Sequence, residues 1–189
     1  MTRRRIFTLA GIVAIVVFAM SIALVFADYV QESDAARALV ERFGYVGMLL
    51  LSIVAGLNLF VPIPAATFTP VYIAAGFPLY GIIITLVIGT TIADSIGYLI
   101  GLGGRHLAEL KYPKLREHIG AFAERHRVAV LPLVFLWSSF APLPNETILI
   151  PLALAGMRFR TLIVPLLLGT IVHQTYLAYG LTSVFEYLF

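Results

Sequence analysis

Long apolar runs fill most of this sequence, and its charged residues are gathered between them. The first run, residues 6–27, is long enough to cross a hydrocarbon core of about 30 Å as a helix. Apolar residues make up 60% of the chain and charged residues only 12%, against about 25% charged residues in an average soluble domain. No water-soluble fold buries that much apolar surface. The sequence therefore predicts an all-α integral membrane protein with one membrane domain.

The N-terminal run has two interpretations. Arginines at positions 3–5 precede residues 6–27, and residues 25–27 suit a signal peptidase. A cleaved signal peptide is therefore one alternative, but its apolar core is usually only about 7–15 residues long. We expect an additional transmembrane helix over 6–27. The polar stretch 28–43 is expected to form a short interfacial helix capped by Ser33.

The centre of the chain contains an internal repeat with an offset of 80 residues. Gly89-Thr90 coincides with Gly169-Thr170 under this shift, and the identities that precede that pair include six within residues 60–76. These identities join Phe60, Pro62, Pro64, Thr67, Ala75 and Gly76 to Phe140, Pro142, Pro144, Thr147, Ala155 and Gly156. Single identities in apolar sequence arise by chance, whereas paired prolines followed at the same distance by Ala-Gly are specific. We therefore expect two related halves.

Each half is expected to consist of a re-entrant hairpin followed by a transmembrane helix. The paired prolines forbid a continuous helix, and about 30 residues per hairpin fall short of the roughly 40 that two spans need. The predicted segments are hairpin 1 over 44–76, a span over 79–102, an amphipathic cytoplasmic segment over 103–127, hairpin 2 over 128–156 and a span over 162–181. Kinked, tilted spanning helices in place of each hairpin are the alternative.

Charge predicts the orientation of this repeat. A single crossing separates the hairpins, so they are expected to enter from opposite faces, as an inverted repeat. With a cytoplasmic N-terminus, 11 of the 13 Lys and Arg residues fall on the cytoplasmic side, and only Arg37 and Arg42 fall outside. This asymmetry follows the positive-inside rule and predicts a multi-pass protein of the cell membrane. The basic segment 103–127 either contacts anionic lipid head groups or only sets the topology.

Broken helices near the membrane midplane are typical of secondary transporters, so the hairpin tips are the first candidates for a site. Acidic side chains at membrane depth are functional candidates by default, because burying a charge there is costly. The predicted substrate or proton pathway residues are Glu146, Asp94, Asn145, Asn58, His173, Gln174 and Tyr98. The predicted tip residues are Pro62, Pro64, Thr67, Pro142, Pro144 and Thr147.

Each of these residues also has a purely structural interpretation. Asp94 is suited to a hydrogen bond between helices, and Glu146 to reaching water with its flexible side chain. His173 is suited to packing in the last span, and Asn58 and Asn145 to capping helix ends. The prolines would then only shape the fold.

Several functional classes have no support in the sequence. Cysteine is absent, which excludes disulfides and thiolate metal sites, and the histidines lack metal-ligand spacing. Metalloprotease, serine-hydrolase and phosphate-loop motifs are missing, so we expect no enzyme activity and no cofactor. Nucleic-acid binding has no support either. The oligomeric state is left open, a homo-oligomer included.

The motifs of the repeat resemble the DedA family, also known as the VTT or SNARE-associated Golgi protein family. The resemblance rests on Phe60-x-Pro62-x-Pro64 with Ala75-Gly76, on Ala93-Asp94-Ser95-Ile96-Gly97-Tyr98-x-x-Gly101, and on Phe140-x-Pro142 with Ala155-Gly156. It covers about residues 44–179. It implies two facing re-entrant hairpins and lipid translocation. Bacterial members are linked to moving undecaprenyl phosphate, with proton coupling proposed, and eukaryotic relatives scramble phospholipids.

The chain departs from the family pattern at both tips. The family often has Pro-Gly-Glu at the first tip, where this chain has Ala65 and Ala66 after the second proline. It often has two arginines at the second tip, where Ser139 and Asn145 stand here. Phosphate is normally bound by arginine, so these departures weaken the assignment to a polyprenyl phosphate. Glu146 occupies the repeat position of Ala66, as if the acid had changed hairpins.

The sequence therefore predicts a flippase- or scramblase-like transporter of a lipid, a polyprenyl phosphate or a phospholipid, with membrane lipids as its partners. Proton coupling is an open feature of this prediction. A proton-coupled transporter of a small solute or ion is the first alternative. A membrane organiser that transports nothing is the second.

Overall fold

The computed structural model describes residues 3–57, 63–111, 121, 125, 127–141 and 143–188, and the described part is helical without strands. Three of its helices are long and apolar enough to cross a membrane: Asp34–Gly56, Leu79–Gly104 and Phe159–Leu188. The prediction of an all-α, multi-pass membrane protein is therefore confirmed at this level.

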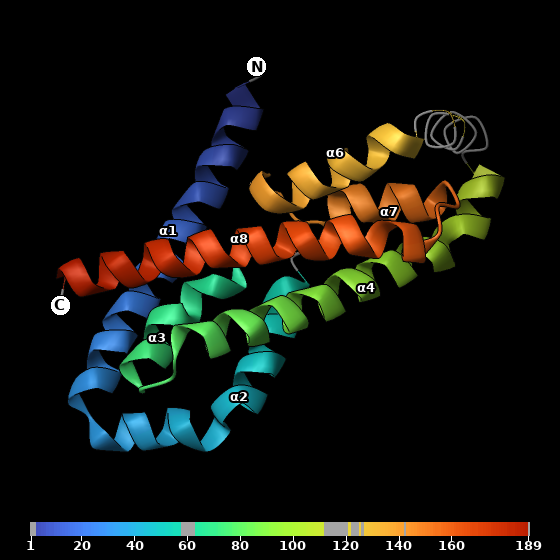
Figure 1. Cartoon of the computed structure of the whole chain (residues 1–189). Coiled ribbons are helices and arrows are strands. Elements are labelled where there is room, and N and C mark those ends of the chain that lie inside the picture. The colour runs from blue at the N-terminus through green and yellow to red at the C-terminus, as the bar shows by residue number, and fades with distance from the viewer. Residues whose placement is uncertain are drawn as a thin grey trace.

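The described elements follow one another from the N-terminus to the C-terminus as shown in Figure 1. They are α1 (Arg3–Glu32), α2 (Asp34–Gly56), the 3₁₀ turn η1 (Ala65–Phe68), α3 (Thr69–Ala74), α4 (Leu79–Lys111), α6 (Arg127–Phe140), α7 (Glu146–Leu154) and α8 (Phe159–Leu188).

The corner between α1 and α2 lies at Ser33. Its hydroxyl accepts a hydrogen bond of 3.3 Å from the amide of Ala36, which confirms the predicted cap. The predicted helix boundary was wrong, because α1 continues past residue 27 to Glu32 and α2 begins at Asp34. A second break lies inside α2, where Gly44 has φ 51° and ψ −145°. Only glycine adopts this conformation without strain, so α2 consists of two helical parts that meet at Gly44, and the part after Gly44 is called here the first hairpin arm.

Two long helices, α4 and α8, cross the middle of the molecule side by side (Figure 1). The arm α2 packs along α4, and α6 packs along α8. Each contact centres on a glycine: Gly89 of α4 lies against Ser52, and Gly169 of α8 lies against Ser138. The second arms pack the other way round, α7 against α4, and η1 with α3 against α8; α3 also packs closely on α1, which has no counterpart in the second half. Small residues permit these close approaches.

The turns that follow the two second arms have the same hydrogen bonds. Gly76 and Gly156 have φ values of 87° and 90°. The amide of Gly76 donates to the carbonyl of Ile73 at 2.8 Å, and the amide of Gly156 donates to that of Ala153 at 3.0 Å. Both helix ends therefore use a left-handed residue to satisfy their last carbonyls.

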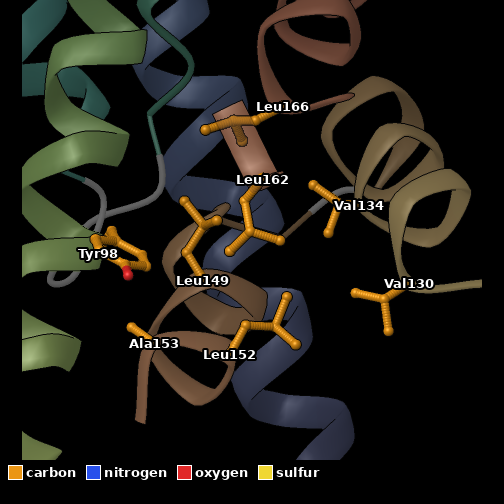
Figure 2. Packing of buried hydrophobic residues seen from close by; sticks show 8 residues of the cluster. All are labelled: Tyr98, Val130, Val134, Leu149, Leu152, Ala153, Leu162 and Leu166. Atoms are coloured by element: carbon orange, nitrogen blue, oxygen red, sulfur yellow. The ribbon is translucent and has the colours of Figure 1, made fainter. Parts of the chain in front are cut away.

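One hydrophobic cluster lies between the second hairpin, formed by α6 and α7, and the long helices α4 and α8. Figure 2 shows its buried side chains pointing toward one another: Tyr98, Val130, Val134, Leu149, Leu152, Ala153, Leu162 and Leu166. The hydroxyl of Tyr98 donates a hydrogen bond of 2.8 Å to the carbonyl of Met157, just after α7. This cluster holds the second hairpin against both long helices.

Two predicted segments differ from the structure. The span predicted over 79–102 was expected to end at residues 103–104, but these two glycines lie within α4, which continues to Lys111. Most of the predicted amphipathic segment beyond Lys111 lies outside the described residues. The last helix, α8, extends beyond the predicted span 162–181 at both ends.

Candidate binding site between the hairpin tips

A small pocket with a cavity volume of about 70 Å³ lies where both hairpins meet α4 and α8. The first hairpin contributes Gly56, Pro64 and Ala65, and the second contributes Ala141 and Pro144. The polar side chains that line the pocket are those of Thr90, Asp94, Ser138, Asn145, Thr170, His173 and Gln174. The sequence placed Asp94, Asn145, His173, Gln174 and the two tip prolines Pro64 and Pro144 at one site, and the structure brings these six together.

Asp94 connects α4 to the second hairpin by a hydrogen bond. It lies in α4, is 3% exposed, and its Oδ2 accepts a hydrogen bond of 3.0 Å from Nδ2 of Asn145. Asn145 is the residue that precedes α7, and its own side chain makes no capping hydrogen bond to that helix. Asp94 therefore makes the hydrogen bond between helices that its structural interpretation predicted. The same carboxyl group also faces the pocket.

Glu146 lies beside the pocket and does not line it. Its side chain is 2% exposed and packs on α4 at Gly97, where an added Cβ would lie 2.7 Å from Cγ of Glu146. Gly97 follows Asp94 by three positions and so lies on the same face of α4. The missing side chain of Gly97 thus makes room for a second carboxyl group close to Asp94. Glu146 is buried inside the protein and does not extend to its surface.

The α8 wall of the pocket is built from Thr170, His173 and Gln174. Nε2 of Gln174 lies 3.5 Å from Oγ1 of Thr90 across the two long helices. Thr90 donates its own hydroxyl hydrogen to the carbonyl of Leu86 at 2.8 Å. The hydroxyl of Thr90 is therefore an acceptor toward Gln174, which directs the amide nitrogen of Gln174 to Thr90 and leaves Oε1 for another partner.

The imidazole of His173 is held by two neighbours. Its Nδ1 lies 3.1 Å from the carbonyl oxygen of Ser139 and 3.1 Å from the hydroxyl of Tyr176. The ring of Tyr176 stacks on Phe140 with centroids 6.3 Å apart. These contacts orient His173 at the end of α6, where it lines the pocket.

Exposed apolar side chains lie beside the pocket. Leu143 lines the pocket and is 50% exposed. Phe140 directly precedes the lining residue Ala141, and Tyr176 contacts the lining residue His173; they are 61% and 42% exposed. Polar lining residues and exposed apolar side chains therefore occur close together.

The other predicted site residues lie away from the pocket. Tyr98 supports the turn after α7, as described above. Thr67 is buried in the first hairpin, and Thr147 is exposed on α7. Asn58, Pro62 and Pro142 lie outside the described residues.

The sequence reasoning missed Thr90, Ser138 and Thr170. The pair Gly89-Thr90 and Gly169-Thr170 stood in the repeat, but a threonine in an apolar helix usually bonds to its own helix. The pocket-facing role of Thr170 therefore becomes visible only once the helices are packed.

The polar groups of the pocket suit a ligand held by hydrogen bonds. No group of three metal-binding side chains occurs within the described residues. The chain matches no protein-family model, and comparison with curated proteins and solved structures finds no significant match. The resemblance to the DedA family accordingly stays a prediction from the residues.

Proposed function

We propose that this protein is a membrane transporter that moves a lipid head group across the bilayer, in the manner of a flippase or scramblase. The observation that carries the proposal is the polar pocket between the hairpin tips, which has the exposed apolar side chains of Leu143, Phe140 and Tyr176 close to it. A polar head group would occupy the interior while the acyl chains stay in the lipid outside Leu143, Phe140 and Tyr176.

The length of the first hairpin arm supports a site at membrane depth. The arm of α2 after the break at Gly44 has about 12 residues, or about 18 Å at 1.5 Å per residue. It is shorter than the roughly 30 Å of the hydrocarbon core. A re-entrant hairpin whose tip stops inside the bilayer fits this length better than a spanning helix does. The freed backbone groups at the tips would face the pocket, as such breaks require.

The packing of the two halves supports an inverted repeat. In each half the first arm packs on its own long helix at a glycine, and the second arm packs on the long helix of the other half. The turns at Gly76 and Gly156 also repeat at an offset of 80 residues. Two hairpins entering from opposite faces would place one pocket within reach of both leaflets, which is the arrangement that alternating access needs.

The exposed apolar side chains beside the pocket favour a lipid over a small solute. A soluble substrate would gain nothing from contact with Leu143 and Phe140, whereas an amphiphile would contact both polar and apolar side chains. Proton coupling through Asp94 and Glu146 is part of the proposal, because both carboxyl groups are buried on one side of α4. The cell membrane is the proposed location, with the N-terminus in the cytoplasm.

Lipid movement in proteoliposomes tests the function. Fluorescent acyl-labelled phospholipids would be reduced by dithionite from outside, and the fraction that becomes accessible would be followed over time. We expect movement with the wild type, a strong loss with Asp94→Asn or Glu146→Ala, and no loss with Glu186→Gln, an exposed acid on α8. Protein-free rates for the wild type would refute the function, and equal rates for the wild type and Glu146→Ala would remove that residue from it.

Cysteine labelling tests the inverted hairpins, because the chain has no native cysteine. Ile63 and Leu143 occupy equivalent positions at the two tips, and both are partly exposed. Impermeant maleimides should reach Ile63→Cys from outside and Leu143→Cys from the cytoplasmic side. Labelling of both positions from the same side would contradict the inverted arrangement.

A further inference from the structure

We infer that the pocket binds the ammonium group of an amine-bearing lipid head rather than a phosphate. This inference rests on the proposed function, because it names the kind of head group that the same site would accept. It follows from the charges around the pocket, from two buried oxygen atoms without partners, and from the helix ends that face the pocket.

The membrane-embedded part of the chain contains carboxyl groups and no cationic Lys or Arg. Residues 43–104, 128–157 and 161–189 include none of the 13 Lys and Arg residues. The pocket is lined by Asp94, and Glu146 is buried close to it on the same face of α4. A phosphate bound here would lie beside carboxyl groups without the bidentate arginine that normally holds it. An ammonium would face a carboxylate and neutralise it.

Two buried oxygen atoms on α8 lack a hydrogen-bond partner among the described residues: Oε1 of Gln174 and Oγ1 of Thr170. Both residues line the pocket, and they are 3% and 2% exposed. Buried polar atoms are nearly always paired, so a ligand is expected to supply the missing partner. Thr90 occupies the nitrogen of Gln174, which leaves the oxygen as an acceptor.

Oε1 of Gln174 can only accept, and the hydroxyl of Thr170 can accept as well as donate, so both can receive N–H donors of a primary ammonium, which has three. Asp94 uses Oδ2 to accept from Asn145, and its carboxylate has further lone pairs for a second donor. Together with Gln174 and Thr170, it gives acceptors from both long helices. A phosphate has acceptors only and would leave Oε1 of Gln174 unpaired.

The helix ends add to this preference. The C-terminal ends of α2 at Gly56 and of α6 at Phe140 adjoin the pocket, and helix C-termini carry partial negative charge. The N-terminus of α7, which favours anions, already has the buried carboxyl group of Glu146 in its first turn and Asp94 hydrogen-bonded to the preceding residue. The partial positive charge at the N-terminus of α7 is therefore already balanced by carboxyl groups, whereas the partial negative charges at the C-termini of α2 and α6 favour a cation as the ligand.

The single tryptophan provides a reporter for binding. Trp137 lies in α6, and its Nε1 donates a hydrogen bond of 3.4 Å to the carbonyl of Pro144, which lines the pocket. Purified protein in detergent would be titrated with dioctanoyl phosphatidylethanolamine, phosphatidylcholine and phosphatidylglycerol, and Trp137 fluorescence would be recorded. The choline lipid has the same charge as the ethanolamine lipid but no N–H donors.

We expect the ethanolamine lipid to bind about tenfold or more tightly than the glycerol lipid. One hydrogen bond to a charged group contributes enough binding free energy to change the dissociation constant about tenfold. The choline lipid should bind less tightly than the ethanolamine lipid. Equal or tighter binding of phosphatidylglycerol would overturn the inference. Free ethanolamine that binds as tightly as its lipid would overturn the assignment to a lipid.

Variants locate the effect. Thr170→Val and Gln174→Leu should each reduce the preference for ethanolamine several-fold. Thr182→Val, at a buried threonine of α8 that bonds to Ala178 and lies outside the pocket, should leave it unchanged. Asp94→Asn would be compared as well. Thermal unfolding would be measured for each variant, and the two α8 variants decide the outcome if Asp94→Asn fails to fold. An unchanged preference in both would overturn the inference.

The inference and the proposed function fail separately. Selective ethanolamine binding without movement of any lipid in proteoliposomes would refute the transporter and keep the inference. Lipid movement with equal binding of the three head groups would refute the inference and keep the transporter.

Discussion

Replacing Gly101 by alanine tests the contact that holds the second hairpin against α4. An added Cβ would lie 2.9 Å from Cβ of Ala153, 2.9 Å from the carbonyl oxygen of Ile150 and 3.0 Å from its Cα. Two of these atoms belong to the backbone of α7, so no side-chain rotation relieves the contact, and α7 has to retreat from α4. Gly103, two residues further along the same helix, has no atom within 4 Å of its added Cβ and supplies the matched control.

The difference between the two variants isolates the cost of packing. Each substitution gains about the same helix propensity, up to about 1 kcal/mol, so this gain cancels in the comparison. Overpacking a tight contact typically costs about 1–3 kcal/mol. For a chain of 150–250 residues, 1 kcal/mol corresponds to about 2–4 °C, so Gly101→Ala should unfold about 2–12 °C below Gly103→Ala.

Thermal unfolding in detergent, followed by Trp137 fluorescence and by circular dichroism, measures this difference. The retreat of α7 should also lengthen the 3.0 Å hydrogen bond between Asn145 and Asp94 and slow lipid movement. Equal unfolding temperatures for Gly101→Ala and Gly103→Ala would show that α7 does not pack on α4 as described. The reasoning about the second tip would then fall with it.

Three further predictions concern single groups. Tyr98→Phe removes the hydrogen bond to the turn after α7 and should cost about 1 kcal/mol, whereas Tyr187→Phe, on an exposed ring, should leave the unfolding temperature unchanged. Gly76→Ala and Gly156→Ala should each cost about 1–2 kcal/mol from their positive φ alone, and a clear inequality between them would contradict the equivalence of the turns. Ser33→Ala should lower stability by about 0.5–2 kcal/mol through loss of the cap on α2.

Much of the local structure could be read from the chain. Ser33 was recognisable as a cap because a capping side chain needs only the amides that follow it. An apolar stretch was seen to begin at Gly44, but the kink at this glycine, with its φ of 51°, was not predicted. The paired prolines indicated two breaks at equivalent places, and α6 does end at Phe140, just before the second pair.

Helix boundaries were predictable only where local signals decide them. Gly103 and Gly104 looked like the end of a span, yet α4 continues to Lys111. Glycine lowers helix propensity by about 1 kcal/mol, which neighbouring turns in a long helix outweigh. The corner between α1 and α2 was likewise displaced from residue 27 to Ser33.

The sequence by itself indicated a lipid environment, helical secondary structure and two helix breaks at the paired prolines. These features follow from apolar composition and from the local effects of proline and glycine on the backbone. Only the tertiary structure decided which side chains meet. Asp94 and Asn145 are 51 positions apart and pair because α7 packs on α4. Gln174 of α8 lies 3.5 Å from Thr90 of α4 because the two long helices pack side by side. Such partnerships depend on how helices pack in three dimensions, which no local pattern records.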